Sequence, residues 1–425
     1  MIHFNTLGNG LKRGLLGFSK NISKDFPKTT RRFVADMIFG IIASNSCKLT
    51  DIGRALKEDT SLKKVVDRLG RNLAGFSKNE TLMANYLAAV RSSIGANTML
   101  LIDGGDVTKP CSPKMEAIGS VYDASTGAYG DGYWTMGVVA LTENRCQPIP
   151  VYEKLYPCTK QGGSGFNAET KTALQYLRDN FDKSTPRIFD RGFDSGEIMQ
   201  ELVENDERFI IRQNQNRKTI HNGKTTKTED VVRGLDCRHT LRFHSKTGNV
   251  STCKIGMTSV VLPNLHHLKL NMVVCKEFGE NPLVLYTNLD ETEESIAVRI
   301  VKAYLMRWRI EEFYAFKKQG LKFEDFRVRG LDSIRTLDLL LTVAIGYIGT
   351  LCAKVDEDGS VLALIFASKR VQKCHVFLKK TKFLYYALLD GISCVFAYLR
   401  CGISYYFLPT PKSMQISLPG FSKMG

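Results

Sequence analysis

The sequence lacks any uncharged run long enough to cross a lipid bilayer. Its longest such run covers residues 339–353, which is 15 residues, whereas a transmembrane helix needs about 18 or more apolar residues. The N-terminal residues also lack the apolar stretch and the small-residue cleavage site of a secretory signal. We therefore expect residues 339–353 to form a buried helix, and we expect no membrane partner.

The sequence also lacks paired cysteine motifs. Its eleven cysteines are scattered singly, with no C-x-x-C and no Cys/His spacing of the zinc type. An odd number of scattered cysteines is typical of reduced thiols in the cytoplasm. A chain of 425 residues can bury a large core without disulfides or a structural metal. We therefore expect a cytoplasmic protein stabilised by hydrophobic burial.

The net charge of +16 is concentrated at the two ends of the chain. Residues 1–95 carry 16 basic and 7 acidic side chains, and residues 354–425 carry 10 and 4. The 258 residues between them are nearly neutral, with 33 basic and 32 acidic side chains. Basic flanks favour a polyanionic partner such as nucleic acid, although solvated helix faces would explain the same charge.

Residues 1–95 have the apolar periodicity of helices, and we expect a basic helical region here. The segment 61–74 places basic side chains beside apolar ones, as helices that dock on a duplex do. A plain helical bundle is an equally good interpretation of the pattern. The candidate phosphate contacts in this segment are Lys63, Lys64, Arg68 and Arg71.

From residue 98 onward the pattern changes to that of a mixed α/β layer. The expected strands are 98–102, 133–141, 148–155, 187–189 and 208–212, and the expected helices are 167–181 and 195–205. Residues 213–290 alternate β-formers with Gly and Asn turn signals, which predicts a β-rich insertion. We therefore expect an α/β core in two parts, 96–212 and 291–353, followed by a basic C-terminal region, 354–425, that contacts DNA or a second subunit.

Two of the expected strands end at an aspartate, Asp103 and Asp190. Ending a buried strand at a carboxylate is costly unless the charge is paired, and a divalent metal is one such partner. Ligand sites in open sheets lie at the carboxyl ends of strands. An aspartate that caps a turn is the alternative for each position.

A predicted helix over residues 293–319 carries a stripe of polar side chains. Tyr304, Arg307, Glu311 and Lys318 fall within about 60° of arc on a helical wheel. A solvated stripe with Arg307 paired to Glu311 would explain this spacing. Three carboxylates, however, are suited to holding two Mg²⁺ ions about 3.5–4 Å apart for phosphoryl transfer, with Tyr304, Arg307 and Lys318 holding phosphates.

The spacing Y-x₂-R-x₃-E-x₆-K, present as Tyr304, Arg307, Glu311 and Lys318, resembles the signature of the IS4-type DDE transposases. The segments LLIDGGDVTKP around Asp103 and Asp190-Arg191-Gly192-Phe193 resemble the family's segments around its first and second catalytic aspartates. PLVLYTNLD resembles the strand before the glutamate-bearing helix. The resemblance covers roughly residues 95–345, with its motifs in the family's order.

The resemblance implies an RNase H-like fold and assigns roles to individual residues. It implies Asp103, Asp190 and Glu311 as the catalytic and metal-binding carboxylates, with Mg²⁺ or substituting Mn²⁺, as two ions. Asp106 and Glu312 are the neighbouring alternatives. We prefer Asp103 because it ends the apolar run directly, and Glu311 because Glu312 lies outside the stripe. The implied DNA contacts are Tyr304, Arg307 and Lys318, to which we add Arg191 and Trp308, although Trp308 also suits packing.

The sequence therefore predicts a DNA transposase that binds the terminal inverted repeats of an insertion sequence, cuts at its ends and joins the 3′ strands to target DNA. The resemblance implies a homodimer at synapsis and a prokaryotic, nucleoid-associated location, and we expect no small-molecule substrate. One alternative is an RNase H-like nuclease that does not join strands. Another is a catalytically inactive DNA-binding protein derived from a transposase.

Overall fold

The computed structural model describes residues 4–123, 126–214, 216–244, 250–263, 267–289, 296–369 and 383–399, with residues 265, 371, 381, 402 and 403. Its α-helices are α1 Phe4–Ile22, α2 Lys28–Ser44, α3 Leu49–Leu56, α4 Leu62–Ala74, α5 Asn79–Val90, α6 Phe166–Asn180, α7 Gly196–Glu204, α8 Thr228–Gly234, α9 Ile296–Leu305, α10 Trp308–Ala315, α11 Leu331–Ala353, α12 Gly359–Ala367 and α14 Tyr385–Tyr398. Its strands are β1 Leu100–Thr108, β2 Gly119–Asp123, β3 Ala128–Leu141, β4 Pro148–Tyr156, β5 Arg187–Phe189, β6 Phe209–Arg212, β7 Lys218–His221, β8 Lys224–Lys227, β9 His239–His244, β10 Val250–Leu262, β11 Leu268–Lys276 and β12 Leu283–Thr287.

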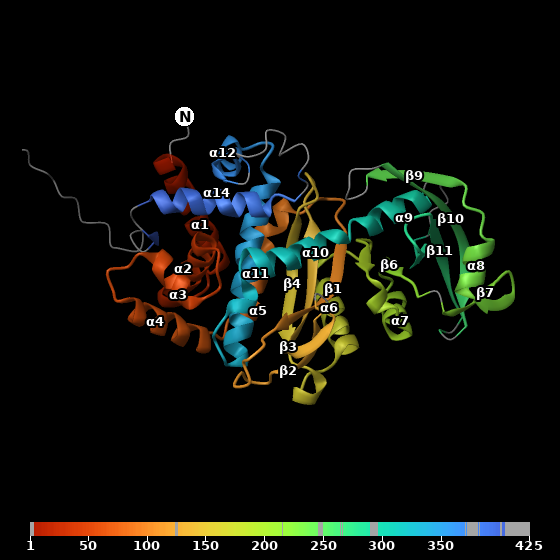
Figure 1. The fold of residues 1–425 in the computed structure, drawn as a ribbon, viewed down its shortest axis with the longest axis horizontal. Helices are drawn as coiled ribbons and strands as arrows, with labels where there is room; N and C mark the ends of the chain where they lie inside the picture. Colours follow the sequence, from red (N-terminus) through yellow and green to blue (C-terminus); the bar gives the residue numbers. More distant parts are fainter. Residues whose placement is uncertain are drawn as a thin grey trace, which may run out of the picture.

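The core of the molecule is a five-stranded mixed sheet in the spatial order β4-β3-β1-β5-β6 (Figure 1). The first three strands form an antiparallel meander, and β5 and β6 run parallel to β1. β5 is buried at all three residues, as expected for a central parallel strand covered on both faces. This topology is RNase H-like, and it confirms the mixed α/β fold expected from the sequence.

The β-rich segment extends this sheet. β12 pairs antiparallel with β6, and β11, β10, β7 and β8 follow in that order, with β9 also paired to β10. The described residues therefore form one sheet of twelve strands. In Figure 1 the added strands make the lobe to the right of the core.

Helices cover both faces of the core sheet, and glycines permit their close approach. α10 packs on β1 and β4, where the ring of Tyr314 lies over Gly105 and Gly137. A Cβ atom on Gly137 would lie only 2.4 Å from the Tyr314 hydroxyl oxygen. α6 approaches the other face, where Phe166 lies against Gly104. The glycines beside Asp103 therefore serve as packing surfaces on both sides of the sheet.

β1 does not stop at Asp103 as the sequence predicted. It continues to Thr108, because the antiparallel pairing with β3 extends through Asp106 opposite Trp134. Only the parallel pairing with β5 ends at Ile102, opposite Phe189. Asp103 therefore lies inside a strand, at the point where its neighbour β5 ends.

The single straight helix predicted over residues 293–319 is interrupted. α9 packs on β10 and β11 of the extension, whereas α10 packs on the core strands. At the junction, Met306 N bonds to Ala303 O and Arg307 N to Tyr304 O, which tightens the turn. A further π-helical turn covers Phe316–Gly320. The break lets one segment cover both parts of the sheet, and it lies at Arg307.

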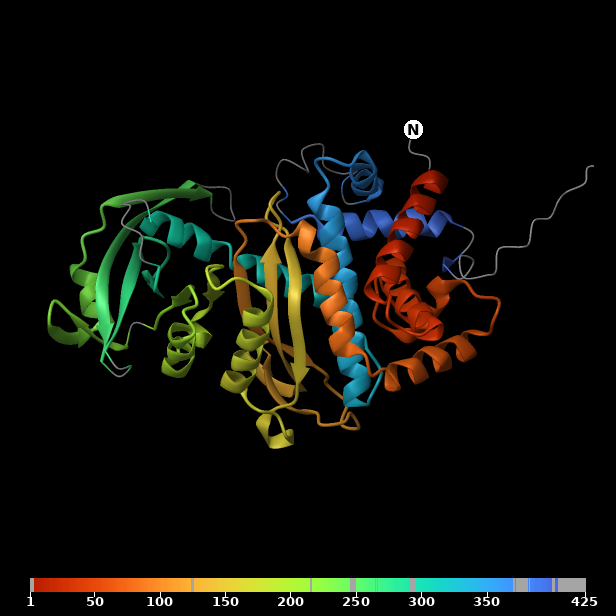
Figure 2. The ribbon, with the colours of Figure 1, turned by 180° about the vertical axis from the view of Figure 1, so that it is seen from behind.

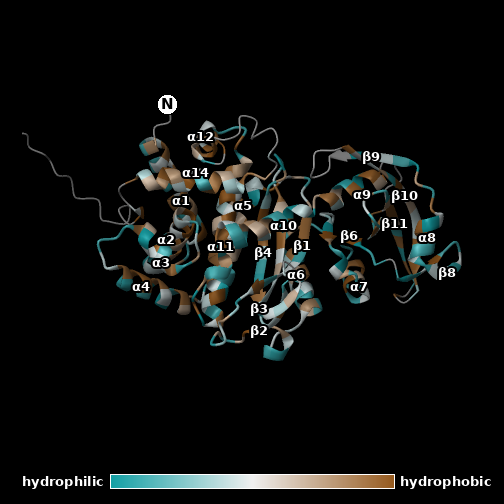
Figure 3. Cartoon of the chain, viewed as in Figure 1, coloured by the Kyte–Doolittle hydropathy of each residue, from teal (hydrophilic) through white to brown (hydrophobic). Residues whose placement is uncertain are grey.

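α11 connects the core sheet to the N-terminal helices (Figure 2). By length and composition it would be apolar enough to cross a membrane, but 83% of its most hydrophobic 18-residue window is buried inside the protein. It packs on β4 on one side and on α2, α4 and α5 on the other. α11 is therefore a core helix, and the predicted buried helix 339–353 is its C-terminal part; in Figure 3 hydrophilic residues lie mainly in its N-terminal turns.

The N-terminal region consists of α1 to α5, as the helical prediction for residues 1–95 required. α14 packs on α1, α2 and α12, so the start of the C-terminal region is folded against the N-terminal helices. Residues 404–425 of the predicted C-terminal region lie outside the described residues.

Candidate active site

The sheet register brings Asp103 and Asp190 together. Ile102 on β1 is paired with Phe189 on β5, and an aspartate follows each of them in the sequence. Because the two strands are parallel, the residues that follow a paired position lie at the same height along both strands. The carboxylates of Asp103 and Asp190 therefore lie side by side. The side chain of Asp103 is 19% exposed and that of Asp190 is 35% exposed. Both are therefore reachable from solvent at one edge of the core.

Arg307 lies among three carboxylates. Its Nη1 donates to Asp103 Oδ2 at 3.0 Å, and its Nη2 donates to Glu311 Oε1. Its Nε lies 4.0 Å from Asp190 Oδ1. The Arg307 side chain is only 10% exposed. Asp103, Asp190 and Glu311, from β1, the end of β5 and α10, therefore converge on one cation.

Two tyrosines hold the aspartates, one at the carboxylate of Asp190 and the other at the backbone of Asp103. The Tyr304 hydroxyl donates to Asp190 Oδ1 at 3.3 Å. The Tyr314 hydroxyl donates to the backbone carbonyl of Asp103 at 2.9 Å. Arg212, at the end of β6, places its Nη1 4.0 Å from Asp190 Oδ1. The sequence analysis missed Tyr314 and Arg212. Neither lies on the predicted stripe, and neither is adjacent in sequence to a predicted site residue.

The electrostatics of the site follow from burial among like charges. Burial raises the pKa of Asp103 to about 7, and Asp190 and Glu311 add to the rise while Arg307 opposes it. Burial also raises the pKa of Tyr304 to about 12, with a further contribution from Asp190. Burial alone would lower the pKa of Arg307, but the surrounding carboxylates raise it above its usual value. Arg307 therefore stays charged, and the raised pKa makes Asp103 readier to take a proton than an ordinary aspartate.

Lys318 lies in a neighbouring cluster. Its ammonium is 2.7 Å from Asp106 Oδ2 and 3.1 Å from Glu324 Oε1. Burial lowers the pKa of Lys318, but the bonds to Asp106 and Glu324 outweigh this and raise it. Asp106 is thus the partner of Lys318, and Asp103 is the aspartate that contacts Arg307. The predicted stripe is therefore divided in the structure. Tyr304, Arg307 and Glu311 lie at Asp103 and Asp190, whereas Lys318 lies at Asp106.

A buried charge cluster lies directly behind the site. The ammonium of Lys317 is 2.7 Å from Glu153 Oε1 on β4 and 2.5 Å from Asp338 Oδ1 on α11. All three side chains are at most 3% exposed. Burial raises the pKa of Glu153 to about 7, although Lys317 opposes the rise. This cluster ties the end of the glutamate-bearing segment to the sheet and to α11, and no sequence spacing indicated it.

The other predicted DNA contacts are distributed over the surface. Trp308 is 47% exposed at the start of α10, and Arg191 is exposed in the turn after Asp190. Lys63, Lys64 and Arg71 are exposed on α4. Arg68 donates twice to Glu58 and once to Asp36, so it also stabilises the helical region. Its role as a phosphate contact stays a prediction.

The donor set suits a divalent cation, although a guanidinium lies within it. In the described part of the chain, no three His, Cys, Asp or Glu side chains are grouped closely enough to hold a metal ion together. Arg307 supplies the positive charge among Asp103, Asp190 and Glu311 instead. Three carboxylates at least partly open to solvent are the hard oxygen ligands that Mg²⁺ and Mn²⁺ prefer. The residues therefore fit such an ion by their chemistry.

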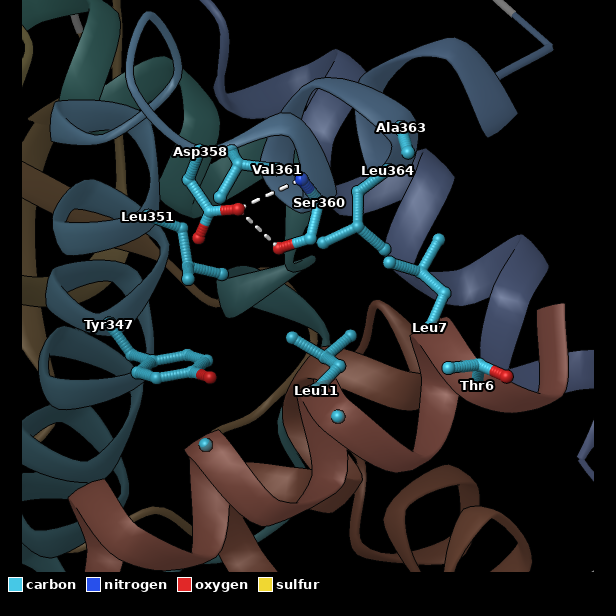
Figure 4. Close-up of a pocket in the computed structure, with 12 residues that line it drawn as sticks. Thr6, Leu7, Leu11, Tyr347, Leu351, Asp358, Ser360, Val361, Ala363 and Leu364 are labelled. Carbon is cyan, nitrogen blue, oxygen red and sulfur yellow. Dashed lines mark hydrogen bonds between the residues drawn. The ribbon is translucent and has the colours of Figure 1, made fainter. Parts of the chain in front are cut away.

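A cavity far from these carboxylates has no comparable chemistry. It occupies about 530 Å³ between α1, α11 and α12 (Figure 4). Its lining is mainly apolar, with Leu7, Leu11 and Leu364 pointing into it. Its one carboxylate, Asp358, accepts from the backbone N and the hydroxyl of Ser360 and so caps α12. We assign it a packing role between the terminal helices.

Comparison with known proteins finds one family match and one structural similarity. Residues 152–346 match the family model of the transposase DDE domain. The matched stretch includes Asp190 and Glu311, and Asp103 precedes it. Among solved structures, the chain is similar to the piggyBac transposase in the cryo-EM structure of its synaptic complex with hairpin DNA. The two chains share 13% identity with a TM-score of 0.44 over 95% of this chain and 82% of that one. The family match supports a DDE transposase.

Proposed function

We propose that this protein is an IS4-type DNA transposase that binds the terminal inverted repeats of an insertion sequence, cuts at its ends and joins the 3′ strands to target DNA. The observation that carries the proposal is the convergence of Asp103, Asp190 and Glu311 on Arg307. The three carboxylates come from distant parts of the sequence, and a purely structural role would not require all of them at one solvent-accessible edge.

Asp103, Asp190 and Glu311 would hold the divalent ions, which we propose to be two Mg²⁺ with Mn²⁺ as a substitute. Transposases of the DDE family generally use divalent metal ions. Bound at these carboxylates, such ions would lower the pKa of an attacking water or 3′-hydroxyl and stabilise the leaving oxygen.

The remaining site residues would position the DNA. Tyr304 and Arg307 lie at the carboxylates, where their donors can hold the phosphate that reacts. Lys318, one cluster further along β1, would hold an adjacent phosphate as a point charge. Arg191 and Trp308 are exposed at the rim, and the exposed basic face of α4 would bind the duplex outside the core. These residues would supply positioning, which dominates catalysis of phosphoryl transfer.

The working assembly we propose is a homodimer that holds two element ends, in the cytoplasm beside the nucleoid. Basic residues at both ends of the chain support binding to long DNA. The basic C-terminal region, residues 354–425, would contact DNA or the second subunit.

A strand-transfer assay with pre-cut ends tests the proposal. The purified protein is incubated with duplexes that carry the element's own terminal sequence and a free 3′-hydroxyl, a supercoiled target plasmid, and Mg²⁺, Mn²⁺ or EDTA. A transposase joins the ends to the plasmid only when a metal ion is present. Cleavage of uncut ends without joining would identify a nuclease. Tight binding of the ends without either reaction would identify an inactive DNA-binding derivative.

A further inference from the structure

A polar cavity of about 600 Å³ lies beside the candidate active site. Its walls are the loop after β1, which includes Lys109 and Lys114, and the segment from Glu324 to Arg329. Lys48, from the loop before α3, closes it on the side of the N-terminal helices. The cavity therefore lies where the helical region meets the catalytic core.

The acidic side chains of this cavity already have partners. Asp325 forms an ion pair with Lys48 at 2.8 Å. Glu324 accepts from the backbone N of Thr108 at 3.0 Å and pairs with Lys318 at 3.1 Å. The ammonium of Lys109 is buried and donates to the backbone carbonyls of Glu324 and Phe326, each at 2.7 Å. These contacts build the floor of the cavity and neutralise both of its carboxylates.

Three cations remain at the cavity after this pairing. Lys114, Arg327 and Arg329 are exposed, and none of them forms an ion pair within the described part of the chain. Arg327 lies close enough to oppose protonation of Lys109, whose pKa is lowered chiefly by burial. A concave surface with three uncompensated positive charges favours a polyanion with closely spaced charges.

The cavity is connected to both regions that we propose to contact DNA. Glu324 in its floor contacts Lys318, which contacts Asp106 on β1. On the other side, the Cys47 thiol donates to the backbone carbonyl of Lys322 at 3.0 Å and so fastens the helical region to this segment. The cavity thus spans the junction between the helical region and the catalytic strand.

We propose that Lys114, Arg327 and Arg329 bind backbone phosphates of the DNA that runs between the N-terminal helices and the active site. The proposal rests on the proposed transposase function. Each guanidinium can hold a phosphate through two parallel N–H donors, and the ammonium adds a point charge. These contacts read no base sequence, so they set the position of the duplex end relative to Asp103 and Glu311.

The salt dependence of DNA binding tests this site. We would measure, by fluorescence anisotropy, the affinity of the full chain for a labelled duplex with the element's terminal sequence at several salt concentrations. The test variant is Lys114→Ala/Arg327→Ala/Arg329→Ala. The matched control is Lys218→Ala/Lys224→Ala/Lys227→Ala, which removes three exposed lysines at β7 and β8, at the far end of the sheet (Figure 1).

Each phosphate contact contributes about 0.9 to the slope of log affinity against log salt concentration. We expect the cavity variant to lower this slope by about 2 to 3, with an unchanged melting temperature because all three side chains are exposed. We expect the control to keep the wild-type slope. A cavity variant that loses no more slope than the control would overturn the proposal, even if the wild-type protein binds and cuts the ends. Failure of the wild-type protein to bind DNA would reject the proposed function together with this site.

A second readout uses the wild-type protein. Cys111 lines the same cavity and is exposed. Bound DNA should slow its alkylation by iodoacetamide several-fold, as followed by mass spectrometry of the Cys111 peptide. Cys237, in the β-rich extension, should react at the same rate with and without DNA. Equal rates at Cys111 in both conditions, under saturating DNA, would contradict the proposed site.

Discussion

Asp103 and Arg307 are 204 residues apart in the sequence, and they form an ion pair of 3.0 Å at the edge of the core sheet. The pair exists because two local features coincide. β5 ends opposite Ile102, which exposes the carboxylate of Asp103, and the helix breaks at Arg307, which directs the guanidinium toward it. In this arrangement the protein's own cation neutralises the carboxylates that we propose to bind metal.

Replacing Arg307 with glutamine should strengthen metal binding and lower the unfolding free energy of the metal-free protein. Without the guanidinium, Asp103, Asp190 and Glu311 would face one another unneutralised, which costs about 1–3 kcal/mol of unfolding free energy, between the values for exposed and for buried ion pairs. A divalent ion would recover that loss, so Mn²⁺ should raise the melting temperature of Arg307→Gln by several degrees more than that of the wild type. Thermal unfolding with and without Mn²⁺ measures this difference.

Arg309→Gln is the control for this experiment, because Arg309 pairs with Glu312 and contacts none of the three carboxylates. It should show the wild-type response to Mn²⁺. An equal Mn²⁺ shift in Arg307→Gln and Arg309→Gln would contradict competition between Arg307 and the metal.

Two adjacent lysines should respond to the same substitution in opposite ways. Lys317→Met leaves Glu153 and Asp338 buried without their counter-charge and should cost about 3–5 kcal/mol of unfolding free energy at neutral pH. Lys318→Met, at a partly exposed pair, should cost about 1 kcal/mol or less but reduce DNA cleavage strongly. Urea unfolding and an end-cleavage assay separate the two. Equal losses of unfolding free energy in Lys317→Met and Lys318→Met would contradict the structural role of Lys317.

Adding one methyl group at Gly137 should disturb the contact between α10 and the sheet. The new Cβ would lie 2.4 Å from the Tyr314 hydroxyl and 2.5 Å from Glu153 Oε2. Overpacking of this kind costs about 1–3 kcal/mol, measurable by urea unfolding. Gly130→Ala on the same strand meets no atom within 4 Å and should be nearly neutral. If the two variants are equally stable, the sheet does not depend on this close approach.

The stability of the helical region should depend on pH through Asp36. Burial raises the pKa of Asp36 to about 7 from an ordinary value of 3.8, against the opposing charges of Arg32 and Arg68. The folded protein therefore holds this proton more tightly than the unfolded chain does. The contribution of Asp36 to the unfolding free energy should fall as the pH rises from about 4 to about 7, by at most about 1.4 kcal/mol per pH unit.

Asp36→Asn removes this titration. The difference in unfolding free energy between Asp36→Asn and the wild type should therefore shift in favour of the variant as the pH rises from 5 to 7. Urea unfolding at several pH values gives both curves. Parallel curves over this range would show that Asp36 does not titrate as its burial requires.

The sequence predicted those parts of the site that depend on short-range patterns. The apolar runs before Asp103 and Asp190 indicated buried strands, and parallel pairing of those strands was enough to bring the two carboxylates together. The spacing of Tyr304, Arg307 and Glu311 indicated a common face. These inferences succeeded because hydrophobic burial and strand register act over a few residues.

Other parts could not be predicted because they depend on contacts between distant elements. The break at Arg307 arises because α9 and α10 cover different parts of the sheet, which helical periodicity does not encode. Lys317 is buried because its ammonium pairs with Glu153 on β4 and Asp338 on α11. Arg68 likewise pairs with Glu58 and Asp36 through tertiary packing. Charge in the sequence therefore does not show which basic side chains form ion pairs inside the fold.

The most direct test of the central claim is a comparison of two neighbouring glutamates in metal-dependent cleavage of the element's ends. Glu311 contacts Arg307 at the carboxylates, whereas Glu312 pairs with Arg309 at 2.7 Å outside them. We predict that Glu311→Ala abolishes cleavage in Mg²⁺ and Mn²⁺ while it still binds the ends, and that Glu312→Ala keeps at least about a tenth of wild-type activity. Equal activity of the two variants would contradict the assignment of Asp103, Asp190 and Glu311 as the catalytic carboxylates.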